Sequence, residues 1–257
     1  MFSFFKSSYS QNILTEVDIH SHLIYNIDDG ALDIDNSIQL IKELYLLGYR
    51  KIITTPHISE VFPNSKEDIL NRYNILRYEL LKQNIDIVIE VAAEYYIDEY
   101  FINILEKDEE LLTFGDKRYL LFEFSHFTPP VEIESLIYDI VLRGYTPVLA
   151  HPERYIYWHS NFENYKELKE LDILFQINLN SINGYYNKNI QNIVLKLIKS
   201  GMVDFVGSDT HHMRHIKNLK NVLSTSLYKK IFKYNKVLNK TLLETKVRPQ
   251  TSKVVAF

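Results

Sequence analysis

The chain has 257 residues, 46% of them hydrophobic and 24% charged, which is typical of a folded globular protein and enough for one large α/β domain. A formal net charge of −4 without a long run of lysine or arginine argues against a dedicated nucleic-acid-binding protein, and the absence of cysteine excludes disulfides, thiolate metal sites and a cysteine nucleophile. Every apolar run is shorter than the roughly 20 residues of a transmembrane helix, and Met1–Lys6 is too short for a secretory signal, so we expect a cytoplasmic protein.

Strand-like and helix-like segments alternate along the chain, which indicates βα units and a parallel sheet. The predicted strands are Val17–Leu23, Ile52–Thr55, Ile85–Ala92, Tyr119–Phe122, Thr146–Ala150, Ile173–Ile177 and Val203–Val206. The segments with apolar residues at helical spacing are Asp35–Leu47, Lys66–Lys82, Glu132–Leu142 and Ile190–Ile198. Glycine follows three of these helices, at positions 48, 144 and 201, where it is typical of a helix end.

The domain organisation is simple. No glycine- or serine-rich linker divides the chain, and no internal repeat is present. We therefore predict one barrel-like α/β domain at residues 16–257, preceded by an N-terminal extension of residues 1–15. Its last stretch, Leu219–Phe257, is expected to form one or two terminal helices and a polar tail.

Side chains that bind metals follow six of the seven predicted strands. They are His20, His22, His57, Glu94, Glu123, His151, Asp209 and His211, and only the sixth strand ends differently, in Asn178. Because the strands of a parallel barrel end at one face, residues far apart in the sequence can meet there. The two members of each pair, His20 with His22 and Asp209 with His211, lie two positions apart, so each pair points to one side of its strand. The sequence therefore predicts a metal centre.

Nitrogen and oxygen ligands without sulfur suit Mn²⁺, Fe²⁺ and Zn²⁺. The candidate ligands are too many for one ion, and a carboxylate can bridge two, so we expect two or three divalent ions. Mn²⁺ is our first choice, with Fe²⁺ or Zn²⁺ as alternatives. The other histidines have no partner at a strand end and are expected to be structural, although His212 and His215 lie close enough in sequence to contact a substrate.

Several short motifs resemble those of the polymerase and histidinol phosphatase (PHP) superfamily. They are Asp18-Ile19-His20-Ser21-His22, Asp28-Asp29-Gly30, Thr55-Pro56-His57, Ala93-Glu94-Tyr95-Tyr96, Glu123-Phe124-Ser125, His151-Pro152-Glu153-Arg154-Tyr155 and Gly207-Ser208-Asp209-Thr210-His211. The resemblance covers residues 16 to 215. Within the superfamily, the chain looks most like the bacterial metal-dependent protein-tyrosine phosphatases of capsule and exopolysaccharide operons.

The resemblance implies a distorted (β/α)7 barrel with three metal ions at the carboxyl ends of its strands. It assigns the first ion to His20, His22, Glu94 and Asp209. Glu94 would bridge to a second ion, bound also by Glu123 and His151. The third would be held by Asp29, His57 and His211. It further implies that Arg154 binds the substrate phosphate; Arg214 is a second candidate for that role, by its position five residues after Asp209.

Four functions are considered for such a centre. The first is hydrolysis of phosphotyrosine by a hydroxide that the metals generate, acting on a phosphotyrosine protein such as a bacterial tyrosine kinase that regulates capsular polysaccharide synthesis. The second is a small-molecule phosphomonoesterase such as histidinol phosphatase, since a shared site does not fix the substrate. The third is a non-catalytic metal-binding regulatory module, and the acidic charge balance makes a nuclease the weakest. The oligomeric state stays open.

Overall fold

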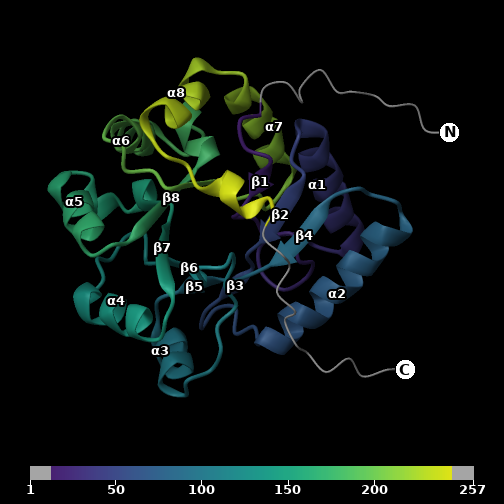
Figure 1. Cartoon of the computed structure of the whole chain (residues 1–257), viewed down its shortest axis with the longest axis horizontal. Coiled ribbons are helices and arrows are strands. Elements are labelled where there is room, and N and C mark those ends of the chain that lie inside the picture. Colours follow the sequence, from purple (N-terminus) through teal and green to yellow (C-terminus); the bar gives the residue numbers. More distant parts are fainter. Residues whose placement is uncertain (1–12, 245–257) are drawn as a thin grey trace.

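Parallel strands form the centre of the structure, which is a computed structural model that describes residues 13–244 (Figure 1). The strands are β1 (Val17–Asp18), β2 (Lys51–Thr54), β3 (His57–Ile58), β4 (Val88–Val91), β5 (Glu94–Tyr96), β6 (Tyr119–Glu123), β7 (Thr146–Ala150), β8 (Leu174–Asn178) and β9 (Phe205–Gly207). They pair in parallel in two sheets, of order β1-β2-β4 and β3-β5-β6-β7-β8-β9. The predicted α/β domain with parallel strands is confirmed.

Two of the predicted strands are interrupted just before the site. The second predicted strand corresponds to β2, which β3 follows after Thr55 and Pro56; the third corresponds to β4, which β5 follows after Ala92 and Ala93. Pro56 has no amide hydrogen to donate, although its carbonyl accepts a hydrogen bond from Glu94 N at 3.1 Å. At these interruptions the backbone leaves the β1-β2-β4 sheet and enters the six-stranded sheet, once between β2 and β3 and once between β4 and β5.

The ends of the first and last strands also approach each other. Ser21 and Thr210 form an isolated parallel bridge. Beside it, His22 N donates to Thr210 O at 2.9 Å and Asp209 N donates to His20 O at 2.8 Å. The continuous ladders nevertheless leave two separate sheets, so closure into a seven-stranded barrel is not confirmed.

Helices lie around the outside of the strands (Figure 1). Within residues 13–244 the α-helices are α1 (Ile34–Leu47), α2 (Lys66–Lys82), α3 (Glu99–Glu106), α4 (Ile133–Leu142), α5 (Glu163–Glu170), α6 (Lys188–Lys199), α7 (Met213–Leu223) and α8 (Ser226–Tyr234). Short 3-10 helices are η1 (Pro152–Arg154), η2 (Ile156–Trp158), η3 (Leu179–Asn183) and η4 (Asn239–Leu242). Within the described residues, no helix has the length and apolar composition needed to cross a membrane.

The four predicted helices are confirmed as α1, α2, α4 and α6, with ends within two residues of the expected ones. Gly48 follows α1 in the left-handed conformation, with φ of 114°, and its amide donates to Tyr45 O at 3.0 Å. Helices α3 and α5 were not predicted, because each has eight residues and buries only two of them. Helices α7 and α8 supply the expected terminal helices. The polar tail from residue 245 and residues 1–12 of the N-terminal extension lie outside the described residues.

The apolar side chains form two clusters on opposite sides of the strands. The larger one packs the helices against the strands, with Ile52 and Phe122 among its members. The smaller cluster packs on the other face of the strands and contains Ile53, Leu121 and Phe205. Consecutive residues of β2 and β6 therefore point to opposite faces, as the pleat of a strand requires. Buried on both faces, the strands give their carboxyl ends a rigid support.

Candidate metal centre

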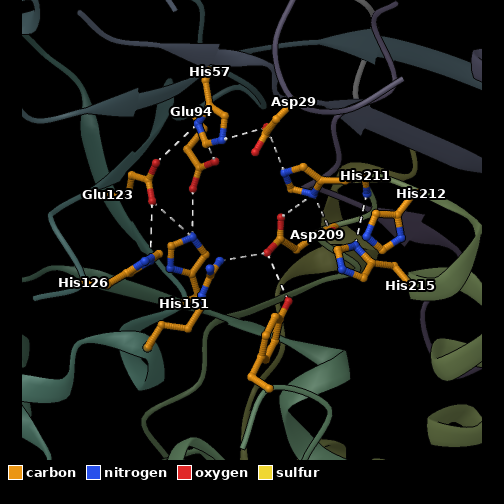
Figure 2. Close-up of a pocket in the computed structure, with 12 residues that line it drawn as sticks. Asp29, His57, Glu94, Glu123, His126, His151, Asp209, His211, His212 and His215 are labelled. Atoms are coloured by element: carbon orange, nitrogen blue, oxygen red, sulfur yellow. Dashed lines mark hydrogen bonds and ion pairs between the residues drawn. The ribbon is translucent and has the colours of Figure 1, made fainter. Parts of the chain in front are cut away.

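A cavity of about 330 Å³ lies at the carboxyl ends of the strands (Figure 2). Its lining residues are Asp29, His57, Glu94, Glu123, His126, His151, Arg154, Tyr186, Asp209, His211, His212 and His215. Seven of the nine predicted ligands are among them. The other two, His20 and His22, are fully buried beside Glu94 and Asp209. The structure thus brings all nine together, while the role of each as a ligand stays a prediction.

The deepest cluster brings His20 and His22 from the first strand segment together with Glu94 and Asp209. His20 Nε2 lies 3.1 Å from Glu94 Oε2 and 3.5 Å from Asp209 Oδ1. His22 Nε2 lies 3.3 Å from the same Glu94 oxygen and 3.5 Å from the same Asp209 oxygen. Four donors on a tetrahedron about 2.1 Å from a central ion are about 3.4 Å apart. The distances from the two imidazoles to each carboxylate therefore match the spacing of ligands that share one metal ion.

Glu94 connects this cluster to a second one. Its Oε2 faces His20 and His22, whereas its Oε1 lies 3.0 Å from His151 Nε2. His151 Nε2 is also 3.5 Å from Glu123 Oε2. One carboxylate thus presents its two oxygens to two groups of donors, which is the arrangement of a bridging ligand.

The third cluster lies at the mouth of the cavity. Asp29 Oδ1 is 3.3 Å from His211 Nε2 and 3.6 Å from His57 Nε2. The neighbouring Asp28 is engaged differently, since its Oδ2 accepts from His22 Nδ1 at 2.9 Å and from His57 N at 3.1 Å. The structure therefore places the second aspartate of the Asp28-Asp29-Gly30 motif against the imidazoles and the first one behind them.

Polar side chains behind the clusters fix the orientation of the candidate ligands. His20 Nδ1 contacts Gln176 Oε1 at 2.7 Å, which leaves Nε2 directed at the carboxylates. Asn178 Nδ2 donates to Asp209 Oδ2 at 2.6 Å. Both amides come from β8, which corresponds to the one predicted strand without a candidate ligand at its end. The polar Asn178 at that strand end was the only sequence signal for this supporting role.

Charges in the cavity favour metal binding. Burial alone raises the pKa of Glu94, but the imidazoles of His20 and His57 outweigh it and hold the pKa well below its usual value. Burial lowers the pKa of His57 and that of His151 to about 4, so both rings are neutral at pH 7. Nearby carboxylates raise the pKa of His20 and of His22, and burial raises that of Glu123, so the metal-free clusters hold protons that a divalent cation would displace.

The buried Glu94 Oε2 makes no hydrogen bond of good geometry, although imidazole nitrogens of His20, His22 and His57 lie 3.1–3.3 Å from it. A buried carboxylate oxygen without such a bond is costly, and a divalent cation would compensate it. The donor set, its spacing and this oxygen fit a site for divalent metal ions.

Two of the candidate ligands adopt the left-handed backbone conformation, which is uncommon outside glycine. His151 has φ of 33° and Asp209 has φ of 49°. Such residues cost about 1–3 kcal/mol each and cluster at functional sites. Here the bends after β7 and β9 turn the two side chains into the cavity.

Of the two predicted phosphate-binding arginines, only Arg154 lines the cavity. Its Nη1 lies 3.2 Å from Asp209 Oδ2, and its guanidinium lies 5.0 Å from the centre of the Tyr186 ring. Arg214 is exposed in the first turn of α7 and is absent from the lining, because that face of the helix points away while His215 points inward. Arg154 therefore lies at the cavity and Arg214 does not, while their phosphate-binding roles stay predictions.

Four further residues line the cavity; of these, only His212 and His215 were considered for substrate contact from the sequence. His126, His212 and His215 all line the cavity, as does Tyr186, whose hydroxyl donates to Asp209 Oδ2 at 3.3 Å. None of them follows a strand directly, so the pattern of strand ends could not reveal them.

We predict that Gly30→Ala disturbs the candidate metal centre. A Cβ at Gly30 would overlap the carbonyl oxygen of His22 and lie 2.5 Å from its Cβ. The Asp28-Asp29 turn must then move away from His22, with an expected destabilisation of about 1–3 kcal/mol. Urea unfolding measures this, with Leu32→Ala as the control in the same loop because that side chain is 80% exposed. A variant as stable as the wild type would contradict the close packing of this turn.

We also predict a pH effect from Glu153, a fully buried carboxyl group behind the cavity. Its Oε1 accepts from Ser181 Oγ at 2.7 Å and from Asn178 N at 2.9 Å, and its Oε2 has no partner. Burial raises the pKa of Glu153 from 4.5 to about 7 despite these hydrogen bonds. A raised carboxyl pKa means that the folded state binds the proton more tightly. The stability that protonation contributes is therefore lost as the pH rises from about 4.5 to about 7.

Glu153→Gln removes this titration. Between pH 5 and pH 8, the unfolding free energy of the metal-free wild type should fall relative to the variant by up to about 3 kcal/mol. Urea unfolding of both proteins at the two pH values measures the difference. An equal gap between them at pH 5 and pH 8 would show that Glu153 does not titrate in this range.

A parallel α/β domain whose strand ends carry linked clusters of imidazoles and carboxylates is typical of metal-dependent proteins. The chain matches the family described as "Capsular polysaccharide synthesis, CpsB/CapC" over residues 16–241. It therefore belongs to the CpsB/CapC family.

Named relatives agree with this assignment. The chain is 33% identical to the tyrosine-protein phosphatase YwqE of Bacillus subtilis over 77% of its length and 78% of that protein. It is 32% identical to the tyrosine-protein phosphatase CpsB of Streptococcus pneumoniae, covering 77% of this chain and 83% of that one.

A solved structure is also similar. The crystal structures of YwqE and CpsB are described as those of unique metal-dependent tyrosine phosphatases, and one of their chains matches with a TM-score of 0.76 and 29% identity. The match covers 90% of this chain and 96% of that chain.

Proposed function

We propose that the chain is a metal-dependent protein-tyrosine phosphatase that acts in capsular polysaccharide synthesis. The observation that carries the proposal is the cavity in which Arg154 faces three linked clusters of imidazoles and carboxylates. The relatives that share most of the chain are named tyrosine-protein phosphatases, which supports the same activity here.

The finer assignments extend this proposal. We place the chain in the PHP superfamily and propose a distorted seven-stranded barrel, in which β2 with β3 and β4 with β5 each count as one interrupted strand. The contact of Ser21 with Thr210 supports closure between the first and last strands. The proposed substrate is a phosphotyrosine protein, in particular a bacterial tyrosine kinase, which the family's place in capsular polysaccharide synthesis supports. The expected cytoplasmic location stays a prediction.

Three divalent ions, with Mn²⁺ as the expected metal, are proposed for the three clusters. His20, His22, Glu94 and Asp209 would hold the first. Glu94 would share the second with Glu123 and His151, and the third would be held by Asp29, His57 and His211. When bound, such ions activate water at neutral pH and withdraw electron density from phosphoryl oxygens.

Arg154 is proposed to bind the phosphoryl group. Its guanidinium is held from behind by Asp209 and lies over the ring of Tyr186, so its direction in the cavity is fixed before the substrate arrives. A planar guanidinium binds two phosphoryl oxygens at once and stabilises the charge that they carry in the transition state. Asn178, the second partner of Asp209, keeps that carboxylate in place.

The protonation states in the cavity favour an aryl phosphate. The rings of His57 and His151 are neutral at pH 7, since burial lowers the pKa of each to about 4, so neither can donate a proton to a leaving group as a strong acid. A tyrosyl oxygen, with a pKa of about 10, leaves far more readily than an alkoxide and needs less protonation. Hydrolysis of a tyrosine phosphate therefore depends less on a proton donor than hydrolysis of the phosphate ester of an alcohol such as histidinol.

The test is a comparison of substrates with the Mn²⁺-loaded protein. We expect phosphate release from a phosphotyrosine peptide with a kcat/KM at least about 100-fold above that for histidinol phosphate, a difference of about 2.7 kcal/mol in transition-state binding. Turnover of histidinol phosphate without turnover of the peptide would keep the site and contradict the protein substrate. If the protein binds Mn²⁺ but hydrolyses neither the peptide nor histidinol phosphate, the result would favour the alternative of a non-catalytic metal-binding regulatory module.

A further inference from the structure

His126 lies in the loop that follows β6, three residues beyond Glu123. Its carbonyl oxygen accepts a hydrogen bond from Ile156 N at 3.2 Å, which ties the loop to η2. The ring packs against two others, with centres 5.3 Å from that of His151 and 5.8 Å from that of Tyr155. These contacts hold the imidazole in place, although the side chain is partly exposed.

The direction of the ring is the informative feature. His126 Nε2 is buried and has no hydrogen-bond partner. It lies 3.8 Å from Glu123 Oε2, which is too long for a hydrogen bond, and Figure 2 shows the ring pointing at Glu123 and His151. A buried nitrogen that faces other metal-binding atoms without a hydrogen bond to them is unusual in a folded protein, and a cation bound between these atoms would explain it.

The spacing of these donors fits one cation. One ligand atom each from Glu123, His126 and His151 can be chosen so that all three lie within 4.8 Å of one another. Donors about 2.1 Å from a shared ion lie between about 3 and 4.2 Å apart in tetrahedral and octahedral arrangements, with opposite donors at the upper limit. Small side-chain rotations would bring the three donors into this range.

We propose that His126 is an additional ligand of the ion held by Glu94, Glu123 and His151. This inference rests on the metal centre of the proposed function and extends it. The second ion would then have two imidazoles and two carboxylates, an environment close to that of the ion between His20, His22, Glu94 and Asp209. Imidazole suits Zn²⁺ and Fe²⁺ better than Mn²⁺, so His126 would also shift the preference of this position toward those ions.

Metal binding tests the proposal without any substrate. Metal-free protein is titrated with Co²⁺ alone, and both the number of bound ions and the visible absorption are followed. His126→Phe keeps a ring against His151 and Tyr155 but removes the nitrogen donor. We expect this variant to bind one of the ions at least about tenfold more weakly and to show a changed absorption spectrum. The control is Phe127→Ala in the same loop, where the side chain is 76% exposed and the wild-type titration is expected.

A crystal structure of the metal-loaded wild-type protein, with ions located by anomalous scattering, requires no variant. We expect His126 Nε2 within about 2.0–2.3 Å of the ion beside Glu123 and His151. A distance of more than about 3 Å from every ion, or the same number of ions, affinities and spectrum in His126→Phe, would overturn the proposal. If the wild type binds no Co²⁺ at all, the metal centre fails and the proposed function fails with it.

Discussion

Replacement of both His20 and His22 by alanine is expected to remove phosphatase activity, with a loss of at least about 1,000-fold in kcat/KM, equivalent to about 4 kcal/mol. The two rings supply half of the donors of the deepest cluster, and both are fully buried. Their loss leaves Glu94 and Asp209 without the imidazoles that hold the pKa of both carboxyl groups well below the usual range. Because Glu94 also faces His151, a second cluster is disturbed at the same time.

The measurement is the rate of phosphate release together with the metal content after equilibrium dialysis against Mn²⁺. We expect the double variant to retain fewer ions than the wild type. His159→Ala is the control, because His159 is the one histidine of the described chain that neither lines the cavity nor belongs to the buried pair. Wild-type activity in the double variant would show that chemistry occurs elsewhere in the protein.

Replacement of Arg154 by alanine is expected to reduce kcat by about 100- to 1,000-fold, with metal content unchanged. Arg154 is the only arginine in the cavity lining, and its contacts with Asp209 and Tyr186 hold the guanidinium in place. Arg154→Lys keeps the positive charge but cannot bind two phosphoryl oxygens with a planar fork, so we expect only partial recovery.

Steady-state kinetics on a phosphotyrosine peptide measure both Arg154 variants, with Arg214→Ala for comparison. Since Arg214 is exposed and outside the cavity lining, a much smaller loss is expected for it. A larger loss in Arg214→Ala than in Arg154→Ala would reverse the assignment of the phosphate-binding arginine.

The candidate ligands could be predicted from the sequence because imidazoles and carboxylates rarely follow so many buried strands by chance. Parallel strands end at one face, so the position of His57, His151 and Asp209 just after predicted strands was sufficient to predict that they lie close together. The choice of Asp29 over Asp28 came only from the family resemblance. The structure gives the physical reason, since Asp28 is engaged with His22 Nδ1 and cannot face the cavity.

The supporting residues could not be predicted in the same way. Gln176 and Asn178 act through single amide hydrogen bonds to His20 and Asp209, and such contacts have no recognisable sequence pattern. His126 lies in a loop, where its direction depends on packing against Tyr155. The short helices α3 and α5 were missed because a stripe of two buried residues cannot be distinguished from a loop.

The fold was predictable in its class but not in its details. Strand β1 was expected to extend through Leu23, but its ladder with β2 ends at Asp18. Beyond that point the backbone lies between two segments: Ser21 O accepts from Thr55 N after β2, and His22 N donates to Thr210 O after β9. The sequence predicts that His20 and His22 meet Asp209, but a local pattern does not reveal the backbone contact that ends the ladder at Asp18.

The central claim is that the clustered imidazoles and carboxylates form a metal centre that hydrolyses phosphotyrosine. The most direct test is to titrate metal-free protein with Mn²⁺ and measure phosphate release from a phosphotyrosine peptide at each step. We predict no release without metal, release that rises with the occupied sites, and reversal by a chelator. Phosphate release from the metal-free protein, or none from the fully loaded one, would contradict this claim.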